Sequence, residues 1–485
     1  MEDANLLALL NRMNLWWGGE EVQDSLKKAE HRRRDFYKIR ERLMTSQRSI
    51  MTIRGPRQVG KTTLCGQLIE SLLTEDRVPG ERILYLTIEN SAILSNPKGV
   101  IEEAIETFKN NILQKDFRDV DGTVYIFIDE VQKAPNWADT LKYYTDTYSN
   151  LQFVATGSIS TLIKSDAGDT LIGRMDERIM MPMKFIEYVR YESVIDEETV
   201  YDESTELRSK LAESVRDGDS TALRGALSRF FGVYENKKPQ LKRLKDEYLL
   251  KGGYPGVLDE TIPDSYNVLD TDLRNTVTGD LANVFQVEKP EKVLRVLSLL
   301  AASTTSKVSK SSVADAADVS RQTVDAYLEH LDEFYLISRC PTYSGSEYSS
   351  GGLPKIYLQD VGIYNALNGT LAESTLENPD AMGPIFETAV CDHARRLQFF
   401  LSKAQNADIS YNDSGGEVDF VLEGNEYLLP IEVKNGDSTS RSLRGLKQFI
   451  EERDADFGIC INNSDVLENE DGIVHIPAWM FFFLC

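Results

Sequence analysis

The sequence predicts an α/β protein whose first large domain is a parallel sheet with helices on both faces. Three observations predict it. A loop of the pattern G-x-x-x-x-G-K-T, residues 55–62, lies between an apolar strand and an amphipathic helix. A second apolar run, 124–128, ends in two carboxylates. Residues 48–190 alternate strand-like and helix-like segments, with a further strand at Ile83–Ile88.

The loop has the composition that nucleotide phosphates require. It follows the predicted strand Ser49–Ile53 and leads into the predicted helix Leu64–Leu73. Glycines let the backbone approach the phosphates, and the helix N-terminus adds positive charge. We expect Lys61 to reach the β- and γ-phosphates of ATP and the Thr62 hydroxyl to coordinate Mg²⁺. The residues assigned to nucleotide binding in the loop are Gly55, Gln58, Val59, Gly60, Lys61, Thr62 and Thr63.

The two carboxylates and a third strand complete this predicted site. Asp129 and Glu130 follow the buried strand, at the edge where open α/β sheets bind ligands. Asp129 is expected to hold Mg²⁺ through water, and Glu130 to polarise the water that attacks the γ-phosphate. The third strand, Leu151–Ala155, is followed by polar residues that include Ser158. Ser158 is either a sensor of the γ-phosphate or part of a simple turn.

The composition describes an acidic globular chain. Its 485 residues are enough for two to four domains, and 41% of them are hydrophobic, which supports ordinary packed cores. The formal net charge of −24 opposes a protein that coats DNA through a basic surface. It fits a salt-rich cytosol, such as that of a halophilic archaeon, in which an acidic surface stays hydrated and screened.

Cysteine usage and hydropathy predict a cytoplasmic protein. The five cysteines form no C-x-x-C pair, so we expect reduced thiols and no zinc site. The N-terminus lacks the pattern of a secretory signal, and no apolar segment approaches the length of a transmembrane helix, so no membrane partner is expected. The short apolar run Trp479–Leu484 is predicted to be a terminal strand.

The remaining segments are predicted to be mainly helical up to residue 345. Residues 1–47 form a basic helical segment, which is either a solvated face or a contact with nucleotide, another subunit or nucleic acid. Residues 191–289 form a helical region. Residues 290–345 have helix-turn-helix spacing, with Ser320 capping the second helix. Acidic side chains on that helix favour a structural role over DNA reading.

A second chemical site is predicted near the C-terminus. A strand from Gly416 to Leu422 and a partner from Leu428 to Lys434 form a hairpin. Glu432 and Lys434 are two residues apart, so they point to the same side, and Asp419 is on the neighbouring strand. This is the pattern of a metal-dependent phosphodiesterase. Asp419 and Glu432 would bind Mg²⁺, and Lys434 would position or activate water.

Taken together, these motifs resemble a known family. Gly55–Leu64, Ile128–Gln132 and Ala155–Ser158 are similar to the AAA-like P-loop ATPases of archaea and bacteria. Lys355–Gly362 and Gly383–Val390 are similar to the C-terminal domain that this family joins to the ATPase, which has a restriction-endonuclease-like, PD-(D/E)xK-type core. The resemblance implies an AAA-like ATPase domain at 48–190 and a restriction-endonuclease-like α/β domain at 346–485. The helix-turn-helix spacing predicts a winged-helix-like region at 290–345 between them.

The resemblance also implies roles for two further residues. Arg174 is expected to stabilise charge during hydrolysis, in cis or from a neighbouring subunit. Glu387, on a helix, is expected to be the third acidic metal ligand of the nuclease-like domain. The family commonly forms rings, so a homo-oligomer is among the expected arrangements, although nothing in the sequence fixes one.

Two functions remain open from the sequence. The first is an ATP-binding, Mg²⁺-dependent ATPase whose cycle controls the nuclease-like domain, with DNA as a candidate partner. The second is a nucleotide-operated switch or scaffold in defence, signalling or mobile-element biology. In this alternative the nuclease-like domain is inactive, since a fold does not by itself imply a function.

Overall fold

The chain separates into two compact units, Met1–Met181 and Pro182–Cys485. A computed structural model describes residues 3–27, 31–45, 50–94, 97–158, 171, 173–343, 345, 353–369, 374–402, 408–436, 441–467 and 469–485. Ser49, the predicted start of the first strand, lies outside these residues, as do the predicted boundary positions 47, 48 and 346. In the described part, no helix is long and apolar enough to cross a membrane.

The first unit contains the predicted parallel sheet. Its five strands have the order β2-β3-β4-β1-β5, and every pair is parallel. The strands are β1 (Ile50–Arg54), β2 (Ile83–Thr87), β3 (Val124–Asp129), β4 (Leu151–Gly157) and β5 (Met175–Ile179). Because the strands are parallel, the glycine-rich loop after β1 and the paired carboxylates at the end of β3 lie at the same edge of the sheet. The end of β4 lies between them, since β4 is between β1 and β3 in the sheet.

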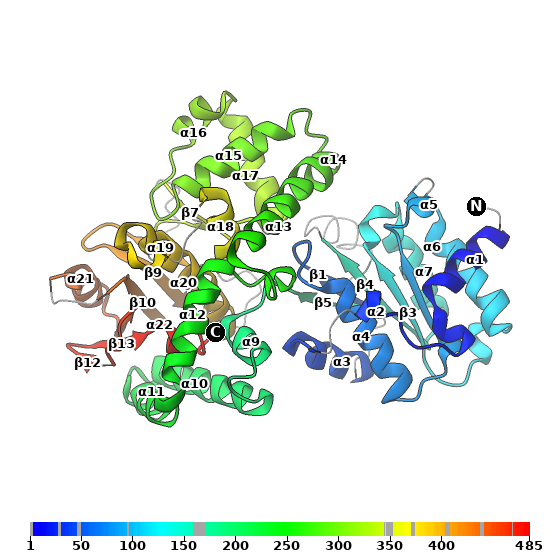
Figure 1. Ribbon diagram of the computed structural model, residues 1–485, viewed down its shortest axis with the longest axis horizontal. Helices are drawn as coiled ribbons and strands as arrows, with labels where there is room; N and C mark the ends of the chain where they lie inside the picture. Colours follow the sequence, from blue (N-terminus) through cyan, green and yellow to red (C-terminus); the bar gives the residue numbers. More distant parts are fainter. Residues whose placement is uncertain are drawn as a thin grey trace. The chain divides into compact units, whose positions relative to one another are not determined.

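Helices cover both faces of this sheet (Figure 1). Ile126 and Ile128 of β3 share a core with α1 (Asp3–Met13), α6 (Val100–Phe108) and α7 (Trp137–Thr147). The other face is covered by α4 (Lys61–Thr74) and by two helices that each contact it, α2 (Asp24–Lys27) and α3 (Arg34–Thr45). Short elements connect them: η1 (Leu15–Gly18), η2 (Gly80–Arg82), α5 (Ser91–Leu94), the π-helix η3 (Lys109–Leu113), η4 (Phe117–Asp119) and η5 (Val131–Lys133).

The second unit begins with helices. They are α9 (Phe185–Tyr191), α10 (Glu197–Asp217), α11 (Thr221–Val233), α12 (Lys238–Lys251), α13 (Ile262–Asn275), α14 (Ala282–Val284), α15 (Pro290–Ala302), α16 (Lys310–Ala317) and α17 (Arg321–Glu333). The predicted cap is confirmed, because the Ser320 side chain accepts a hydrogen bond from the Thr323 N–H at 3.0 Å. An antiparallel pair follows, β6 (Ile337–Cys340) and β7 (Lys355–Leu358).

The chain then forms a six-stranded mixed sheet of order β12-β13-β11-β10-β9-β8. Its strands are β8 (Ser410–Asn412), β9 (Val418–Gly424), β10 (Tyr427–Lys434), β11 (Gly458–Asn462), β12 (Asn469–Glu470) and β13 (Ile473–Pro477). The accompanying helices are α18 (Val361–Asn368), α19 (Ser374–Glu377), α20 (Pro379–Ser402) and α21 (Arg444–Arg453). The predicted hairpin is confirmed, since β9 and β10 pair antiparallel with Ile431 opposite Phe420.

The prediction of a terminal strand at Trp479–Leu484 is wrong. The segment forms a short helix, α22 (Ala478–Phe481), and a turn. Its side chains are buried, and the Phe482 ring lies against those of Tyr248 and His393. An apolar run predicts that a segment is buried but does not predict its backbone conformation. Here the aromatic side chains contact neighbours in several directions, which a helical turn allows better than a strand.

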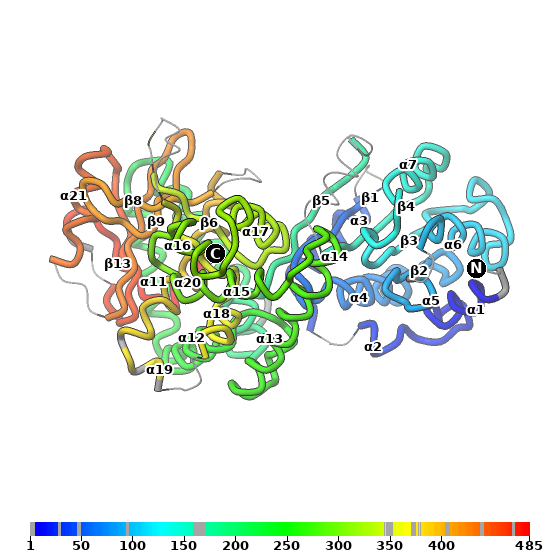
Figure 2. Tube along the Cα trace, turned by 90° about the horizontal axis from the view of Figure 1, so that it is seen from above, coloured from blue at the N-terminus to red at the C-terminus, as the bar shows by residue number. Residues whose placement is uncertain are grey.

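A cluster of backbone hydrogen bonds joins the end of α12 to the start of α18. The Asp360 carboxylate accepts from the N–H groups of Gly253 (2.8 Å), Gly362 (2.8 Å) and Ile363 (3.3 Å). A Cβ at Gly252 would lie 2.1 Å from Asp360 Oδ1, and one at Gly253 would lie 2.2 Å from the Met183 carbonyl oxygen. We call these residues the Asp360 clasp; Figure 2 shows the helices α12 and α18 side by side at this point.

Candidate nucleotide site and carboxylate–lysine cluster

The glycine-rich loop can form only with glycines at its two ends. Gly55 has φ +152°, and a Cβ there would lie 1.9 Å from the Met180 carbonyl oxygen. Gly60 has φ +96° and precedes the first residue of α4. Side chains disfavour such conformations, so glycine allows the loop to turn tightly into the helix. Gln58 also has a positive φ, of 64°, at the exposed tip of the loop.

The Lys61 side chain folds back across this loop. Its Nζ donates hydrogen bonds to the carbonyl oxygens of Gly55 (2.9 Å) and Pro56 (2.8 Å). The side chain is almost fully buried, and burial lowers the pKa of Lys61. The lysine contacts backbone oxygens and forms no ion pair with the carboxylates of the site among the described residues. Phosphate oxygens could therefore replace these carbonyls without breaking a buried salt bridge.

Hydroxyl groups surround the Asp129 carboxylate. Thr62 Oγ1 donates to its Oδ2 at 2.8 Å, the Tyr85 hydroxyl donates to the same oxygen at 3.2 Å, and the Thr156 hydroxyl donates to Oδ1. Burial and the neighbouring charge of Glu130 raise the pKa of Asp129. The facing hydroxyl and carboxylate of Thr62 and Asp129 are oxygen donors of the type that Mg²⁺ prefers, so these residues fit the predicted ion.

Glu130 is held next to Asp129 by two polar side chains. Its backbone is left-handed, with φ 56°, and its two carboxylate oxygens accept from Ser158 Oγ at 2.8 and 2.9 Å. Gln132 Nε2 donates to Oε2 at 2.6 Å. Burial alone would raise the pKa of Glu130, but the charge of Lys61 and these hydrogen bonds lower it. The lowered pKa favours the ionised carboxylate, which is the form that a group polarising water requires.

Two further residues are predicted for this site, and of these only Thr63 lies next to the loop. Thr63 is in the first turn of α4. Arg174 is not brought to the site of its own chain: its carbonyl oxygen accepts from the Ile50 N–H, at the start of β1, whereas the loop begins at Gly55. At about 3.3 Å per residue, these positions are roughly 16 Å apart. The Arg174 side chain instead donates to Asp146 at 2.7 Å.

Sequence reasoning missed several residues that support this site. Tyr85 and Gln132 contact the two carboxylates, and Arg33 donates to the Val59 carbonyl oxygen of the loop at 3.0 Å. The basic segment before α3 therefore contacts the loop within its own domain. Tyr85 had a detectable signal, because it and Thr87 are the two polar residues of an otherwise apolar strand. Arg33 had none that separates it from its basic neighbours.

The residues predicted for the C-terminal site also come together, but with an additional lysine. Glu387 comes from α20, Asp419 from β9, and Glu432 with Lys434 from β10. Lys355 of β7 lies among them. Its Nζ is 3.5 Å from Glu387 Oε1 and 3.7 Å from Asp419 Oδ1. We call these five residues the carboxylate–lysine cluster.

Each carboxylate of the cluster has an internal partner. Lys434 forms an ion pair with Glu432, and the Val433 N–H donates to Asp419 Oδ2 at 2.9 Å. The Tyr357 hydroxyl donates to Glu387 Oε1 at 2.5 Å. Burial, followed by the charge of Asp419, raises the pKa of Glu387 and that of Glu432 to about 8.

The cluster does not fit the predicted divalent metal in this arrangement. Over the described residues, no three His, Cys, Asp or Glu side chains are placed so that they could hold one ion. The three carboxyl groups are instead paired with two ammonium groups, those of Lys355 and Lys434. The structure thus gathers Glu387, Asp419 and Glu432 in one place without forming a metal-binding geometry.

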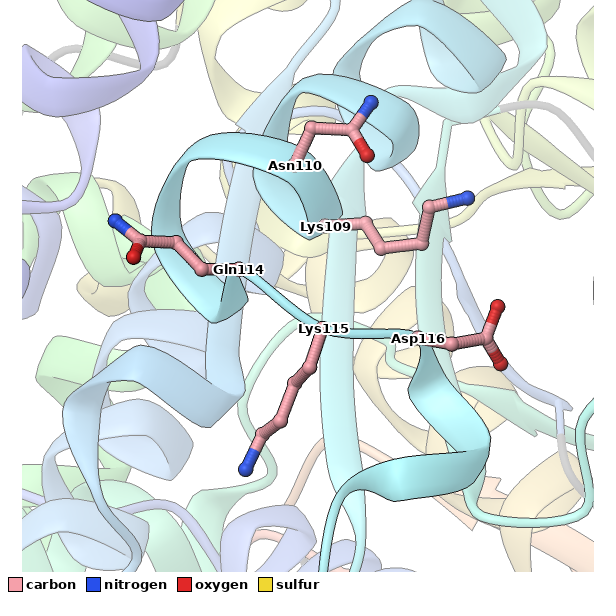
Figure 3. A pocket seen from close by; sticks show the side chains of 5 residues that line it. All are labelled: Lys109, Asn110, Gln114, Lys115 and Asp116. Atoms are coloured by element: carbon pink, nitrogen blue, oxygen red, sulfur yellow. The ribbon is translucent and has the colours of Figure 1, made fainter.

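A separate surface pocket of about 540 Å³ is lined by the π-helix η3 and the residues that follow it (Figure 3). These residues precede the amino end of β3 in the chain. It is lined by Lys109, Asn110, Gln114, Lys115 and Asp116. The phosphate loop follows the carboxyl end of β1, so this pocket is at the opposite edge of the sheet. Figure 3 shows Lys115 pointing away from Lys109, and Lys109 forms an ion pair with Glu106. The pocket is not part of the candidate nucleotide site.

Comparison with protein families divides the chain into three matched regions. Residues 47–189 match a family described as an AAA domain, so the first unit contains an AAA-type ATPase domain. Residues 242–374 match a domain of unknown function, DUF8612, and residues 382–481 match another, DUF4143. Neither description assigns a chemistry to the second unit.

Two curated relatives extend over most of the chain. An uncharacterized protein of Methanocaldococcus jannaschii is 22% identical over 441 residues, 88% of this chain and 84% of the relative. An uncharacterized protein of Haemophilus influenzae is 22% identical over 390 residues, 79% of this chain and 82% of the relative.

Two solved structures are similar only loosely. Aeropyrum pernix ORC2 in its ADP form has a TM-score of 0.31 at 12% identity, covering 73% of this chain and 95% of that chain. C. elegans PCH-2 has a TM-score of 0.22 at 16% identity, covering 44% and 47%. These similarities are too low to support conclusions about this chain.

Proposed function

We propose that this protein hydrolyses ATP at the site in its first unit. The observation that carries the proposal is the Glu130 carboxylate, which Ser158 and Gln132 hold beside the Thr62–Asp129 pair at the end of β3. A water-polarising carboxylate, a hydroxyl–carboxylate pair for Mg²⁺ and a phosphate-binding lysine are the parts that phosphoryl transfer to water requires.

Each residue has a distinct role in this proposal. The loop amides and Lys61 bind the phosphates, with Lys61 exchanging the carbonyls of Gly55 and Pro56 for phosphate oxygens. Thr62 and Asp129 would hold Mg²⁺, which neutralises phosphate charge when bound. Glu130 orients and polarises the attacking water. The Ser158 hydroxyl donates to Glu130. When ATP is bound, this hydroxyl would donate to the γ-phosphate instead.

Substitution of the loop lysine tests this proposal. Lys61→Ala removes the only side-chain cation assigned to the phosphates, so we expect ATP turnover to fall by at least ~100-fold and tight ATP binding to be lost. Turnover and equilibrium binding of a labelled ATP analogue should be measured on the full chain. Lys115→Ala, at the opposite edge of the same sheet, is the matched control. Unchanged turnover in Lys61→Ala would overturn the assignment.

For the second unit, we propose that the ATPase cycle controls a nuclease-like domain, and the cluster favours the version in which that domain is an inactive scaffold. A metal-dependent nuclease needs carboxylates available to a divalent ion, whereas Glu387, Asp419 and Glu432 are paired with lysines. In the competing version the domain cleaves DNA. Arg174 would then serve, in either version, at the site of a neighbouring copy in a homo-oligomer.

Cleavage assays separate the two versions. Labelled single- and double-stranded DNA should be incubated with the full chain and Mg²⁺, with and without ATP, beside Lys434→Ala. The scaffold predicts intact DNA in every sample while ATP is hydrolysed. Cleavage that disappears in Lys434→Ala would instead establish an ATPase–nuclease and show whether ATP gates it.

A further inference from the structure

We propose that Lys355 is the resident cation of the carboxylate–lysine cluster and that it excludes divalent metal ions from the site. The ammonium group takes the place that the sequence pattern assigns to Mg²⁺. Metal binding would then require displacement of Lys355. This proposal concerns the second unit alone, so it does not depend on ATP hydrolysis by the first.

The position of Lys355 is the first support. Its side chain is only 5% exposed, and its Nζ lies within 3.7 Å of carboxylate oxygens on two different elements, Glu387 on α20 and Asp419 on β9. Mg²⁺ binds oxygens at about 2.0–2.1 Å. An ion at the position of this nitrogen would be about 1.5 Å too far from both oxygens, so the separation suits an ammonium group.

The charge of the cluster is the second support. Three buried carboxyl groups in one place repel one another when ionised, because burial removes the water that stabilises ions, and this cost raises the pKa of Glu387 and Glu432 even with both lysines present. Lys434 is occupied by Glu432. Of the cluster's two lysines, Lys355 is therefore the one available to Glu387 and Asp419, and its removal should leave them in need of another cation.

An unpartnered oxygen provides the third support. Glu432 Oε2 is buried and has no hydrogen-bond partner among the described residues. Buried carboxylate oxygens normally have a partner. Glu432 interacts electrostatically with Asp419. Its Oε2 is therefore an oxygen that no side chain of the cluster binds and that a metal ion entering the cluster could contact.

The placement of Lys355 on β7 explains how the cation could be displaced. β7 pairs with β6, which follows α17, and the Val308 N–H donates to the Pro354 carbonyl oxygen immediately before Lys355. The lysine is carried by an antiparallel pair of strands that is bonded to the helical part of the unit and, through Tyr343, to Tyr411 of β8. Its two carboxylate partners are on α20 and β9, so a shift of β7 relative to these elements would withdraw the ammonium group from both.

Manganese binding tests the proposal. Mn²⁺ affinity should be measured by electron paramagnetic resonance on the full chain without nucleotide, in an Asp129→Asn background that removes the carboxylate of the nucleotide site. We expect Lys355→Met to bind Mn²⁺ at least ~10-fold more tightly than the background protein, and Lys355→Met combined with Asp419→Asn to lose that gain. Lys355→Arg keeps the charge and should behave like the background.

Two results would overturn it. The first is equal Mn²⁺ affinity in folded Lys355→Met and the background protein, with folding checked by circular dichroism. The second needs no lysine variant: tight Mn²⁺ binding by the background protein that is lost in Asp419→Asn would show that the cluster accepts metal with Lys355 in place. ATP turnover reports on the other unit, so its loss or retention cannot be confused with either result.

Discussion

The two carboxylate sites of this chain differ in what their lysines contact. In the first unit, Lys61 donates to backbone carbonyls, and the carboxylates of Asp129 and Glu130 accept from hydroxyl groups. In the second unit, Lys355 and Lys434 lie directly against carboxylates. Both sites are buried and acidic, and both combine a lysine with residues at strand ends.

The difference determines which site can accept a ligand. A neutral hydroxyl or carbonyl partner can be exchanged for phosphate or Mg²⁺ at modest cost, because no buried charge is left uncompensated. A buried ion pair is closed to exchange, since removing one partner costs about 3–5 kcal/mol. The same residue types therefore form a site ready for ligand in one unit and a cluster closed by lysine–carboxylate pairs in the other.

Paired substitutions of one carboxylate in each unit should separate the sites most strongly. Glu130→Gln removes the water-polarising base, and we expect ATP turnover to fall by ~10²- to 10⁴-fold with ATP still bound. Glu432→Gln should leave turnover unchanged within ~2-fold. Single-turnover hydrolysis and nucleotide binding measure both effects. Normal hydrolysis in Glu130→Gln would mean that another group positions the water.

Acid should distinguish the second unit through His393. Burial lowers the pKa of this histidine from 6.5 to about 4. Between these pH values His393 is protonated in the unfolded chain and neutral in the folded chain. The contribution of neutral His393 to the free energy of unfolding is fully present above pH 6.5. It is lost as the pH falls towards 4, by about 3 kcal/mol at 1.36 kcal/mol per pH unit. Urea unfolding across this range should show the loss, and His393→Gln should flatten it. Equal slopes in the two proteins would contradict this assignment.

A smaller effect is expected from the hydroxyl that holds Glu130. Ser158→Ala removes both hydrogen bonds to the carboxylate, so its orientation and its lowered pKa are partly lost. We expect the turnover number to fall ~10-fold with less than ~3-fold change in ATP affinity. Ser158→Thr keeps a hydroxyl and should recover part of the rate. A pure loss of affinity would indicate a contact with nucleotide instead.

The smallest effect should come from a tyrosine in each site. Tyr85 donates to Asp129 and Tyr357 to Glu387, so either change to Phe removes one hydrogen bond to a carboxylate. Each should lower the free energy of unfolding by about 1–2 kcal/mol. Only Tyr85→Phe should also alter ATP turnover, by ~3-fold. Thermal unfolding and ATP turnover should be measured for both variants. An equal effect of Tyr85→Phe and Tyr357→Phe on turnover would contradict the assignment of ATP hydrolysis to the first unit alone.

The parts of the molecule that could be predicted are those with local signals. The phosphate loop is encoded in eight consecutive residues, and the hairpin carrying Asp419 and Glu432 follows from alternation on two neighbouring strands. The β9–β10 pairing and the parallel sheet are confirmed. For these elements, residue spacing specifies geometry without knowledge of distant contacts.

The parts that could not be predicted depend on distant contacts. Lys355 lies 32 residues before Glu387, and no spacing rule indicates that its ammonium group enters the cluster. The position of Arg174 follows from the pairing of β5 with β1, which the sequence does not encode locally. The helical turn at Ala478–Phe481 results from aromatic packing against other helices. Each outcome was set by tertiary structure.

The Asp360 clasp limits how the protein can be divided for study. Its carboxylate binds backbone groups more than a hundred residues apart in the chain, at Gly253 and Gly362, and the glycines leave no room for a side chain. A fragment that starts after residue 345 would keep Asp360 but lose the α12 end that it holds. We therefore expect a protein fragment that starts there to be insoluble when expressed. A fragment that starts near Pro182 keeps the clasp intact.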